Sequence, residues 1–193
     1  MSRPGIVLYG PPASGKDTIT RELTQFDPRY MQFRRLKIGA SNSHGYRSAS
    51  MAQLDRLRAE DQVLYENERY GNTYVVDRPH LLEMLDAGQT PVIHLGQLAG
   101  VRAVTTVPAQ WVTVLLWCTR ETAANRALAR GSTDMSARLA AWDETLDDLK
   151  NASASDLVLR LDTDTMPADR AAKTIDSWVT ELRTRNFQGA QPP

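Results

Sequence analysis

The sequence contains a single cysteine, Cys118, so the chain can form no intramolecular disulfide. Proteins without disulfides are typical of reducing compartments. No stretch approaches the roughly 18 consecutive apolar residues that a membrane-spanning helix needs. The apolar run near the N-terminus, within MSRPGIVLYG, is too short for a signal peptide. We therefore expect a cytoplasmic protein that does not bind a membrane.

The sequence also has no excess of charge of either sign. Lys+Arg number 23 and Asp+Glu number 23, whereas a protein that holds a long nucleic acid by its phosphates is usually basic. We therefore expect no nucleic-acid polymer as a partner. Any basic site must be local, which suits a small anionic ligand. The length of 193 residues allows one domain, or one domain with a small inserted subdomain.

The pattern of apolar residues predicts strands that alternate with helices. Short apolar runs predict strands at 4–10, 91–95, 111–118 and 156–161. Helical spacing predicts helices at 16–26, 52–61, 78–87, 121–130 and 166–186, and another that ends near Lys150. In the last helix the residues with core spacing are Ile175, Trp178, Val179 and Leu182. This alternation predicts a parallel sheet with helices on both faces.

The segment 32–76 interrupts the alternation. Its first half is polar and basic without clear periodicity. Its second half carries Val, Tyr and Thr around Gly71-Asn72, a pattern typical of a β-hairpin. We therefore predict an α/β fold with a three-layer core over 1–31 and 77–193, and a small α+β insert over 32–76.

The most informative motif follows the first predicted strand and opens the first predicted helix. It reads Gly10-Pro-Pro-Ala-Ser-Gly15-Lys16-Asp17, which has the spacing and context of a P-loop. The glycines let successive backbone N–H groups point at a phosphate, and the helix N-terminus adds a partial positive charge. Lys16 is expected to contact the β- and γ-phosphates of ATP. The predicted nucleotide-binding residues are Gly10, Ala13, Ser14, Gly15, Lys16, Asp17 and Thr18.

One position departs from the usual P-loop. The residue after the lysine is normally Ser or Thr, whose hydroxyl binds Mg²⁺, but here it is Asp17, followed by Thr18. A carboxylate beside a triphosphate repels it unless a cation lies between them. We therefore favour Asp17 as a Mg²⁺ ligand. The alternative is that Asp17 only caps the start of the helix.

Beyond the P-loop, the chain resembles guanylate kinases over nearly its whole length. Arg34, Lys37, Gly39 and Tyr46 fall at the spacing of the family's Thr-Thr-Arg-x-Pro-Arg-x-Gly segment and its later Tyr. In that family the two arginines and the tyrosine hold the phosphate of the nucleotide acceptor. The resemblance therefore implies an α/β P-loop kinase that uses ATP and Mg²⁺ and phosphorylates the phosphate of a small acceptor. On the same grounds, the acceptor phosphate is expected on Arg34, Lys37 and Tyr46.

The resemblance also implies a short helical lid at about 126–140. Arg126, Arg130 and Arg138 resemble basic residues of the family's lid. Arg126 and Arg130 lie four residues apart, on one helix face. Together with Lys16, these three arginines are the predicted catalytic residues, which neutralise charge at the γ-phosphate in the manner of an arginine finger in the same chain.

Three positions that read guanine in this family are changed. Where the family has Ser, Glu and Ser or Thr, this chain has Tyr30, Tyr65 and Val76. Each lost hydrogen-bond partner weakens the binding of guanine by about 1–3 kcal/mol, because a polar group of the base is then buried unpaired. We therefore expect an acceptor that resembles a nucleoside monophosphate but is not GMP.

The candidate contacts to the body of the acceptor are Tyr65, its neighbour Glu66, and Tyr74. Tyr65, Tyr70 and Tyr74 either stack on a base or pack the insert. The family's Asp-x-Asp on the next core strand is replaced by His94-Leu95-Gly96. The chain thus lacks an acid on this strand and has an additional acid, Asp17, in the P-loop, which we interpret as one acid moved across the metal site. His94 either faces the acceptor or is an ordinary hydrogen-bonded residue.

The same combination is similar to ribose 1,5-bisphosphate phosphokinases, which have Gly-Lys-Asp in the P-loop and lack the guanine-reading Glu. A sugar phosphate is therefore the second candidate acceptor, and the longer blocks shared with guanylate kinases favour the nucleotide. The third alternative is a non-catalytic guanylate-kinase-like binding module. Such modules typically have a degraded P-loop, whereas this chain keeps Lys16 and both glycines. The oligomeric state is left open.

Overall fold

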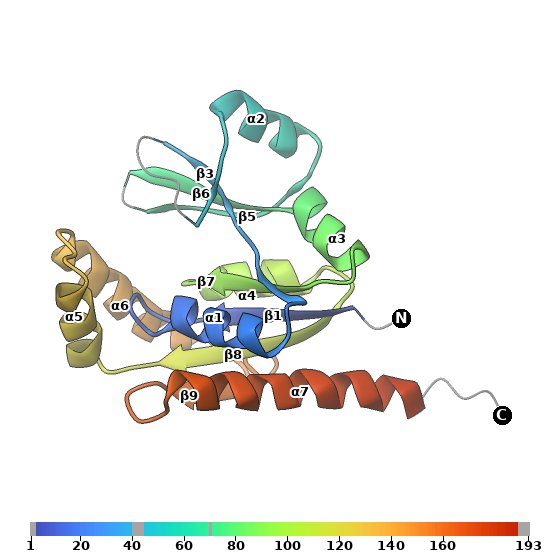
Figure 1. Ribbon diagram of the computed structural model, residues 1–193. Coiled ribbons are helices and arrows are strands. Elements are labelled where there is room, and N and C mark those ends of the chain that lie inside the picture. The colour runs from blue at the N-terminus through green and yellow to red at the C-terminus, as the bar shows by residue number, and fades with distance from the viewer. Residues whose placement is uncertain (1–2, 40–44, 70, 189–193) are drawn as a thin grey trace.

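Two β-sheets organise the chain, as Figure 1 shows for the computed structural model. The structure describes residues 3–39, 45–69 and 71–188. Within these residues the larger sheet has five strands, all parallel, in the order β2-β7-β1-β8-β9. These strands are β1 (Pro4–Tyr9), β2 (Tyr30–Gln32), β7 (Thr90–Leu95), β8 (Gln110–Trp117) and β9 (Leu159–Asp162).

Helices cover both faces of the larger sheet, which confirms the predicted three-layer α/β core. α1 (Lys16–Phe26) and α7 (Ala168–Gln188) cover one face, and α3 (Arg78–Asp86) and α4 (Leu98–Thr105) cover the other. Alternate residues of β1 serve the two layers, because successive side chains of a strand point to opposite faces. Ile6 and Leu8 pack beneath α1 and α7, whereas Val7 and Tyr9 pack beneath α3 and α4.

The spacing predicted for α7 is correct at three of its four positions. Ile175 and Val179 are fully buried, and Leu182 packs against the same cluster. Trp178 is 36% exposed, so its prediction as a core residue is wrong. Residues 175, 179 and 182 follow one helical stripe at i, i+4 and i+7, and position 178 lies at the border of that stripe.

The segment predicted as an insert forms the second sheet. Its strands are β3 (Leu36–Ile38), β4 (Arg47–Ser48), β5 (Val63–Arg69) and β6 (Asn72–Asp77), in the order β4-β3-β6-β5. β5 and β6 are the antiparallel pair expected from the sequence, and α2 (Met51–Ala59) covers the sheet. The insert has a core of its own, made by Leu36, Ile38, Leu54 and Val75. The domain boundaries and an acceptor-binding role for this unit stay predictions. Tyr70 lies outside the described residues.

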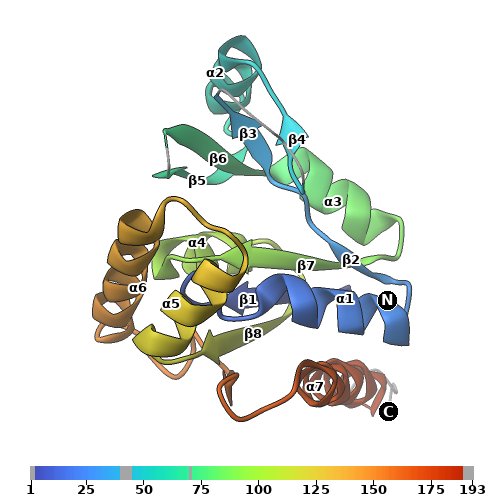
Figure 2. The same cartoon turned by 60° about the vertical axis from the view of Figure 1, so that its left-hand side comes forward.

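The segment 126–140, predicted as a lid, covers the end of one helix and the start of the next, beside the carboxyl end of β8 (Figure 2). The two helices are α5 (Arg120–Ala129) and α6 (Met135–Leu149). The Trp142 indole N–H donates to the Cys118 carbonyl at 3.1 Å, and its ring lies 5.0 Å from that of Trp117. Cys118 is fully buried. Within the described residues, no helix is long and apolar enough to cross a membrane.

Candidate active site

The loop between β1 and α1 requires glycine at both of its predicted glycine positions. Gly10 has a φ of 154°, and a Cβ atom there would collide with the Leu116 carbonyl oxygen on β8. The Gly10 N–H donates to the Leu95 carbonyl on β7 at 3.2 Å. Gly15 has a φ of 93° and is the N-cap of α1. The loop is therefore shaped by both strands that flank β1.

Lys16 lies folded against the loop. Its Nζ donates to the carbonyls of Gly10 and Pro11 at 2.7 and 2.8 Å, and to Ser14 Oγ at 3.2 Å. Burial lowers the pKa of the Lys16 ammonium to about 8. The group is thus charged at neutral pH and is held where a phosphate on the loop would meet it.

We expect the affinity for a non-hydrolysable ATP analogue, measured without Mg²⁺, to fall above about pH 8. An anionic phosphate favours the charged ammonium, so the pKa of Lys16 is higher in the complex than in the free protein. Binding then takes up a proton above pH 8. The dissociation constant is flat below that pH and rises by up to about tenfold per pH unit above it.

Titration calorimetry between about pH 7 and pH 9.5 measures this dependence. The matched control is Lys16→Arg, because a guanidinium keeps its charge over the whole range. A wild-type dissociation constant that stays flat to pH 9.5 would show that Lys16 retains its proton and that burial does not lower its pKa.

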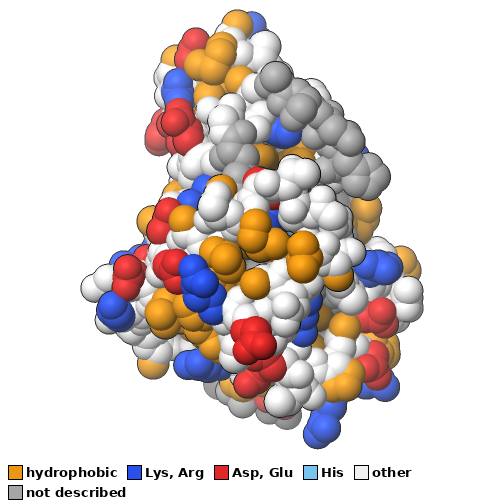
Figure 3. Space-filling view, turned by 90° about the vertical axis from the view of Figure 1, so that its left-hand side faces the viewer, with side chains coloured by type: hydrophobic (Ala, Val, Ile, Leu, Met, Phe, Trp, Pro, Cys, Tyr) orange, Lys and Arg blue, Asp and Glu red, His pale blue; other side chains and the backbone are white. Residues whose placement is uncertain are grey.

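A cavity of about 230 Å³ opens over the loop and is strongly basic. Its basic lining residues are Lys16, Arg35, Arg69, Arg130 and Arg138, against one acid, Asp17. The face that bears α5 and α6 shows no such bias on its outer surface, because Figure 3 shows Lys, Arg, Asp and Glu interspersed over it. Five cations around one loop suit a ligand with several phosphate charges.

Two further hollows adjoin this cavity. One, of about 590 Å³, lies between α1 and the insert and shares Asp17, Arg35, Tyr46 and His94 with the basic cavity. The other, of about 400 Å³, lies on the far side of the loop, toward the segment that follows β9. The loop cavity therefore has room for a ligand to extend on both sides of the phosphate-binding loop.

The three predicted lid arginines are placed differently from one another. Arg130 and Arg138 both line the basic cavity, and Arg138 Nε also donates to Asp134 at 2.7 Å. Arg126 instead donates to the Ala13 carbonyl at 3.2 Å and to the Thr163 carbonyl at 2.6 Å. Its guanidinium thus contacts the loop from the side of the third hollow, and its role at the γ-phosphate stays a prediction.

Arg34, predicted as part of the acceptor clamp, and its neighbour Arg35 line different parts of the surface. Arg34 donates to the Tyr46 carbonyl at 2.8 Å and lines a separate groove on the outer surface. Arg35 lines the basic cavity and the hollow beside α1, and donates to Asn67 Oδ1 at 3.2 Å. Side chains alternate along an extended chain, and Leu36 belongs to the insert core. Arg34 therefore faces away from the cavity, and its role in the acceptor clamp stays a prediction.

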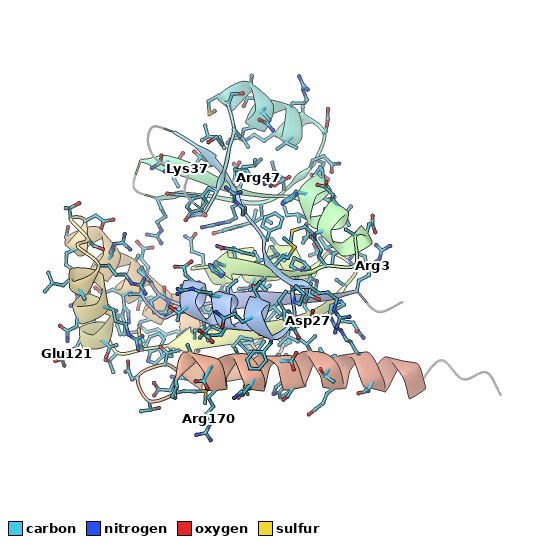
Figure 4. The ribbon with its side chains drawn as sticks, in the orientation of Figure 1. Arg3, Asp27, Lys37, Arg47, Glu121 and Arg170 are labelled. Atoms are coloured by element: carbon cyan, nitrogen blue, oxygen red, sulfur yellow. The ribbon has the colours of Figure 1, made fainter. Side chains whose placement is uncertain are left out.

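Lys37 and the two nearby tyrosines form a packed group in the insert. Lys37 is 8% exposed, and its Nζ lies 6.0 Å from the centre of the Tyr46 ring. Figure 4 shows Lys37 and Arg47 in the upper sheet. The rings of Tyr46 and Tyr74 are 5.0 Å apart, and Tyr74 is 7% exposed. Tyr46 lines the cavity, whereas Lys37 and Tyr74 pack against its ring. The acceptor contacts of all three residues stay predictions.

The residues expected to contact the acceptor body also fall on opposite faces of β5. The Tyr65 hydroxyl donates to Gln97 Oε1 at 2.5 Å, and a Cβ atom at Gly100 would lie 2.8 Å from the Tyr65 ring. Tyr65 thus fills the space over the start of α4. Glu66 points outward and pairs with Arg58 at 3.0 Å. Neighbouring residues of a strand point to opposite faces, so Glu66 and Tyr65 do not lie on the same side of β5, and an acceptor contact by Glu66 stays a prediction.

Tyr30 is also remote from the cavity. It is fully buried on β2, and its hydroxyl donates to Asp176 of α7 at 2.6 Å. Val76 lies in the core beneath α3. Neither residue replaces a base-reading side chain in the cavity itself.

Asp17 lies in the first turn of α1, behind the N-cap Gly15, so it is not the capping residue. Its side chain is 71% exposed, and Oδ1 is 3.4 Å from His94 Nδ1. The hydrogen bond with His94, aided by Lys16, lowers the pKa of the Asp17 carboxyl to about 2. Asp17 is therefore an ionised carboxylate that lines the phosphate cavity.

The donor set fits Mg²⁺ better than a metal bound by protein alone. Within the described residues, no group of three or more His, Cys, Asp or Glu side chains could hold a metal ion. Mg²⁺ usually binds through one or two carboxylates, water and substrate phosphates. The single Asp17 carboxylate at the cavity matches this pattern, whereas Thr18 lines the hollow on the far side of the loop.

The fold and the loop together define the class of protein, and comparison with solved structures agrees. The guanylate kinase from Anaplasma phagocytophilum has a TM-score of 0.66 at 15% identity, covering 94% of this chain and 86% of that chain. The gluconokinase from Sinorhizobium meliloti 1021 has a TM-score of 0.52 at 16% identity, covering 99% and 100%. The chain has a P-loop kinase fold.

Sequence comparison narrows the likeness and confirms the predicted resemblance to guanylate kinases. The guanylate kinase of Thermobifida fusca (strain YX) is 35% identical over 103 residues, which are 51% of this chain and 52% of that protein. The guanylate kinase of Nostoc sp. (strain PCC 7120 / SAG 25.82 / UTEX 2576) is 30% identical over 132 residues, 65% and 66%. The matched segments thus span about half to two thirds of these relatives. No family model matches the chain.

Proposed function

We propose that the protein is an ATP-dependent phosphotransferase that moves the γ-phosphate of ATP onto the phosphate group of a small acceptor. The observation that carries this proposal is the basic cavity, in which five cations surround an intact P-loop. The cations come from three parts of the chain: the loop, the insert and the helices beyond β8. The relatives named guanylate kinase support the same reaction class.

In the proposed reaction the residues of the cavity have different tasks. Lys16 and the loop N–H groups bind the donor phosphates, and Arg130 and Arg138 neutralise charge that develops during transfer. Arg35 and Arg69 hold the acceptor phosphate from the insert side. No general base is needed, because an acceptor phosphate is already ionised at neutral pH.

Mg²⁺ is the metal proposed for this site. When bound, it neutralises charge on the transferring phosphates. Asp17 is the residue that would hold it, because its carboxylate lines the phosphate cavity.

The proposed acceptor is a nucleoside monophosphate other than GMP. Tyr65 stands where guanylate kinases have the Glu that contacts guanine. Its hydroxyl donates to Gln97, and its ring packs against Gly100. Glu66 is turned outward and paired, so it does not replace the lost carboxylate. A sugar phosphate is the second candidate, favoured by Gln32, whose residue type offers amide hydrogen bonds and which lines the hollow beside α1.

We expect ADP release with at least one acceptor at a kcat/KM at least about tenfold above that for GMP, since each unpaired polar group of guanine reduces kcat/KM by about that factor. The measurement is coupled ADP release with GMP, AMP, CMP, dTMP and ribose 1,5-bisphosphate. A tenfold preference for GMP over all others would overturn the selectivity proposal. ATP binding without ADP release for any acceptor would instead favour the non-catalytic binding module.

A further inference from the structure

An acid on α1 and a histidine on β7 are fixed against each other at the edge of the basic cavity. His94 Nδ1 lies 3.4 Å from Asp17 Oδ1, and His94 Nε2 lies 2.7 Å from Thr20 Oγ1. Asp17 and Thr20 are three residues apart on α1, so they share a helix face. Both ring nitrogens of His94 are therefore engaged by one helix.

The hydrogen bonds determine the orientation of the ring. Thr20 is 4% exposed, and the His94 side chain is 13% exposed. A neutral imidazole has one donor and one acceptor nitrogen. With the Thr20 hydroxyl donating to Nε2, the Nδ1–H is left to point at the Asp17 carboxylate. The ring cannot turn away without leaving a buried polar group unpaired.

Within the described part of the chain, the Asp17 side chain has, besides His94, only the charges of Lys16 and Arg130 acting on it. It is 71% exposed, and an exposed carboxylate samples several rotamers unless a hydrogen bond selects one. A group that binds a metal must stay within a narrow range of positions. The contact with the buried ring of His94 supplies this restriction, while the second carboxylate oxygen stays available to the cavity.

We propose that His94 is a positioning residue that holds Asp17 in the orientation in which it binds Mg²⁺ together with a nucleotide. The inference rests on the proposed function of the loop, and it assigns His94 to the metal side of the site rather than to the acceptor. His94 touches neither reactant in this scheme and acts through Asp17. Hydrogen-bonded partners of this kind commonly change metal affinity or activity by about 10–100-fold when they are removed.

The test measures binding of a non-hydrolysable ATP analogue to the full chain by calorimetry, with saturating Mg²⁺ and again with a chelator. The ratio of the two affinities isolates the contribution of the metal. In His94→Ala we expect this ratio to fall by about tenfold or more, while the affinity without Mg²⁺ stays within about twofold of wild type.

Two conservative variants separate positioning from packing. The amide of His94→Asn can reach the place of Nδ1 and donate to Asp17, so it should restore most of the Mg²⁺ effect. His94→Gln places its amide nearer to Thr20 and should not restore it. Thermal unfolding of all three variants shows whether they fold. If Asn and Gln restored the Mg²⁺ effect equally, or Ala left it unchanged, the proposal would be wrong.

A double variant provides the remaining control. If His94 acts only through Asp17, Asp17→Ser and the double variant Asp17→Ser/His94→Ala should have the same Mg²⁺ ratio, whereas additive losses would show that His94 acts by another route. No acceptor is present in this experiment, so failure to phosphorylate any acceptor does not affect its outcome. Failure of the wild-type chain to bind the analogue would overturn both the proposed function and this inference.

Discussion

Replacement of Lys16 by alanine is expected to lower the turnover number by about a thousandfold, a typical effect of removing a cation from the transferring phosphate. The Lys16 ammonium donates to two loop carbonyls and to Ser14. It fills no hydrophobic core, so the fold should survive its removal. The turnover number is measured by ADP release with the best acceptor, and stability is measured by thermal unfolding.

The matched control for this variant is Lys150→Ala. Lys150 is 72% exposed and pairs with Asp147 beyond the end of α6, so its loss should leave turnover unchanged, as expected for a surface ion pair. An unchanged turnover number in Lys16→Ala would reject the phosphotransferase proposal. Loss of the cooperative unfolding transition would show instead that Lys16 holds the loop structurally.

Replacement of Arg35 by alanine is expected to lower kcat/KM for the acceptor by about a hundredfold. This magnitude corresponds to losing a charge-assisted contact with a phosphate, about 1.5–3 kcal/mol. The KM for ATP should change little, because Arg35 belongs to the insert side of the cavity. Steady-state kinetics with each substrate varied in turn make the comparison.

The neighbouring residue is the control. Arg34→Ala removes a guanidinium of the same kind that donates to the Tyr46 carbonyl and lines the outer groove. We expect kcat/KM for the acceptor to stay within about threefold of wild type, as for most surface changes. If Arg34→Ala had the larger effect, the position predicted from the sequence would be right. If both variants weakened ATP binding as much as acceptor binding, the insert would have another role.

The sequence predicts the loop and the core well because both depend on local patterns. The two glycines and Lys16 of the loop have fixed spacing, and the bounds of α1 agree with its predicted range. Strands such as β1 and β8 are short apolar runs whose burial follows from their composition. These features do not depend on knowing which distant residue lies opposite.

The side chains of the insert are harder to predict, because a shift of one residue reverses the face of every side chain. The irregular sequence around Arg34 and Arg35 does not reveal which arginine faces the cavity. The orientation of the two arginines is determined by Leu36 and Ile38, which pack against Leu54 of the following helix. The same reversal separates Tyr65 from Glu66.

Other residues of the cavity have no local signal at all. Arg69 lies at the end of β5 and pairs with Glu144 of α6. Gln97, which immediately precedes α4, accepts a hydrogen bond from the Tyr65 hydroxyl. Each depends on a contact between segments that are far apart in the sequence, and only the folded chain brings them to the cavity.

The position of Gly10 has a consequence for how the protein folds. The motif is contiguous, but its shape depends on Leu95 of β7 and Leu116 of β8, the two neighbours of β1. Closing such long chain segments is slow compared with forming a helix or a hairpin. A chain emerging from the ribosome carries the complete motif long before it carries the strands that shape it, so the loop can take its folded shape only after β8 has been synthesised and paired.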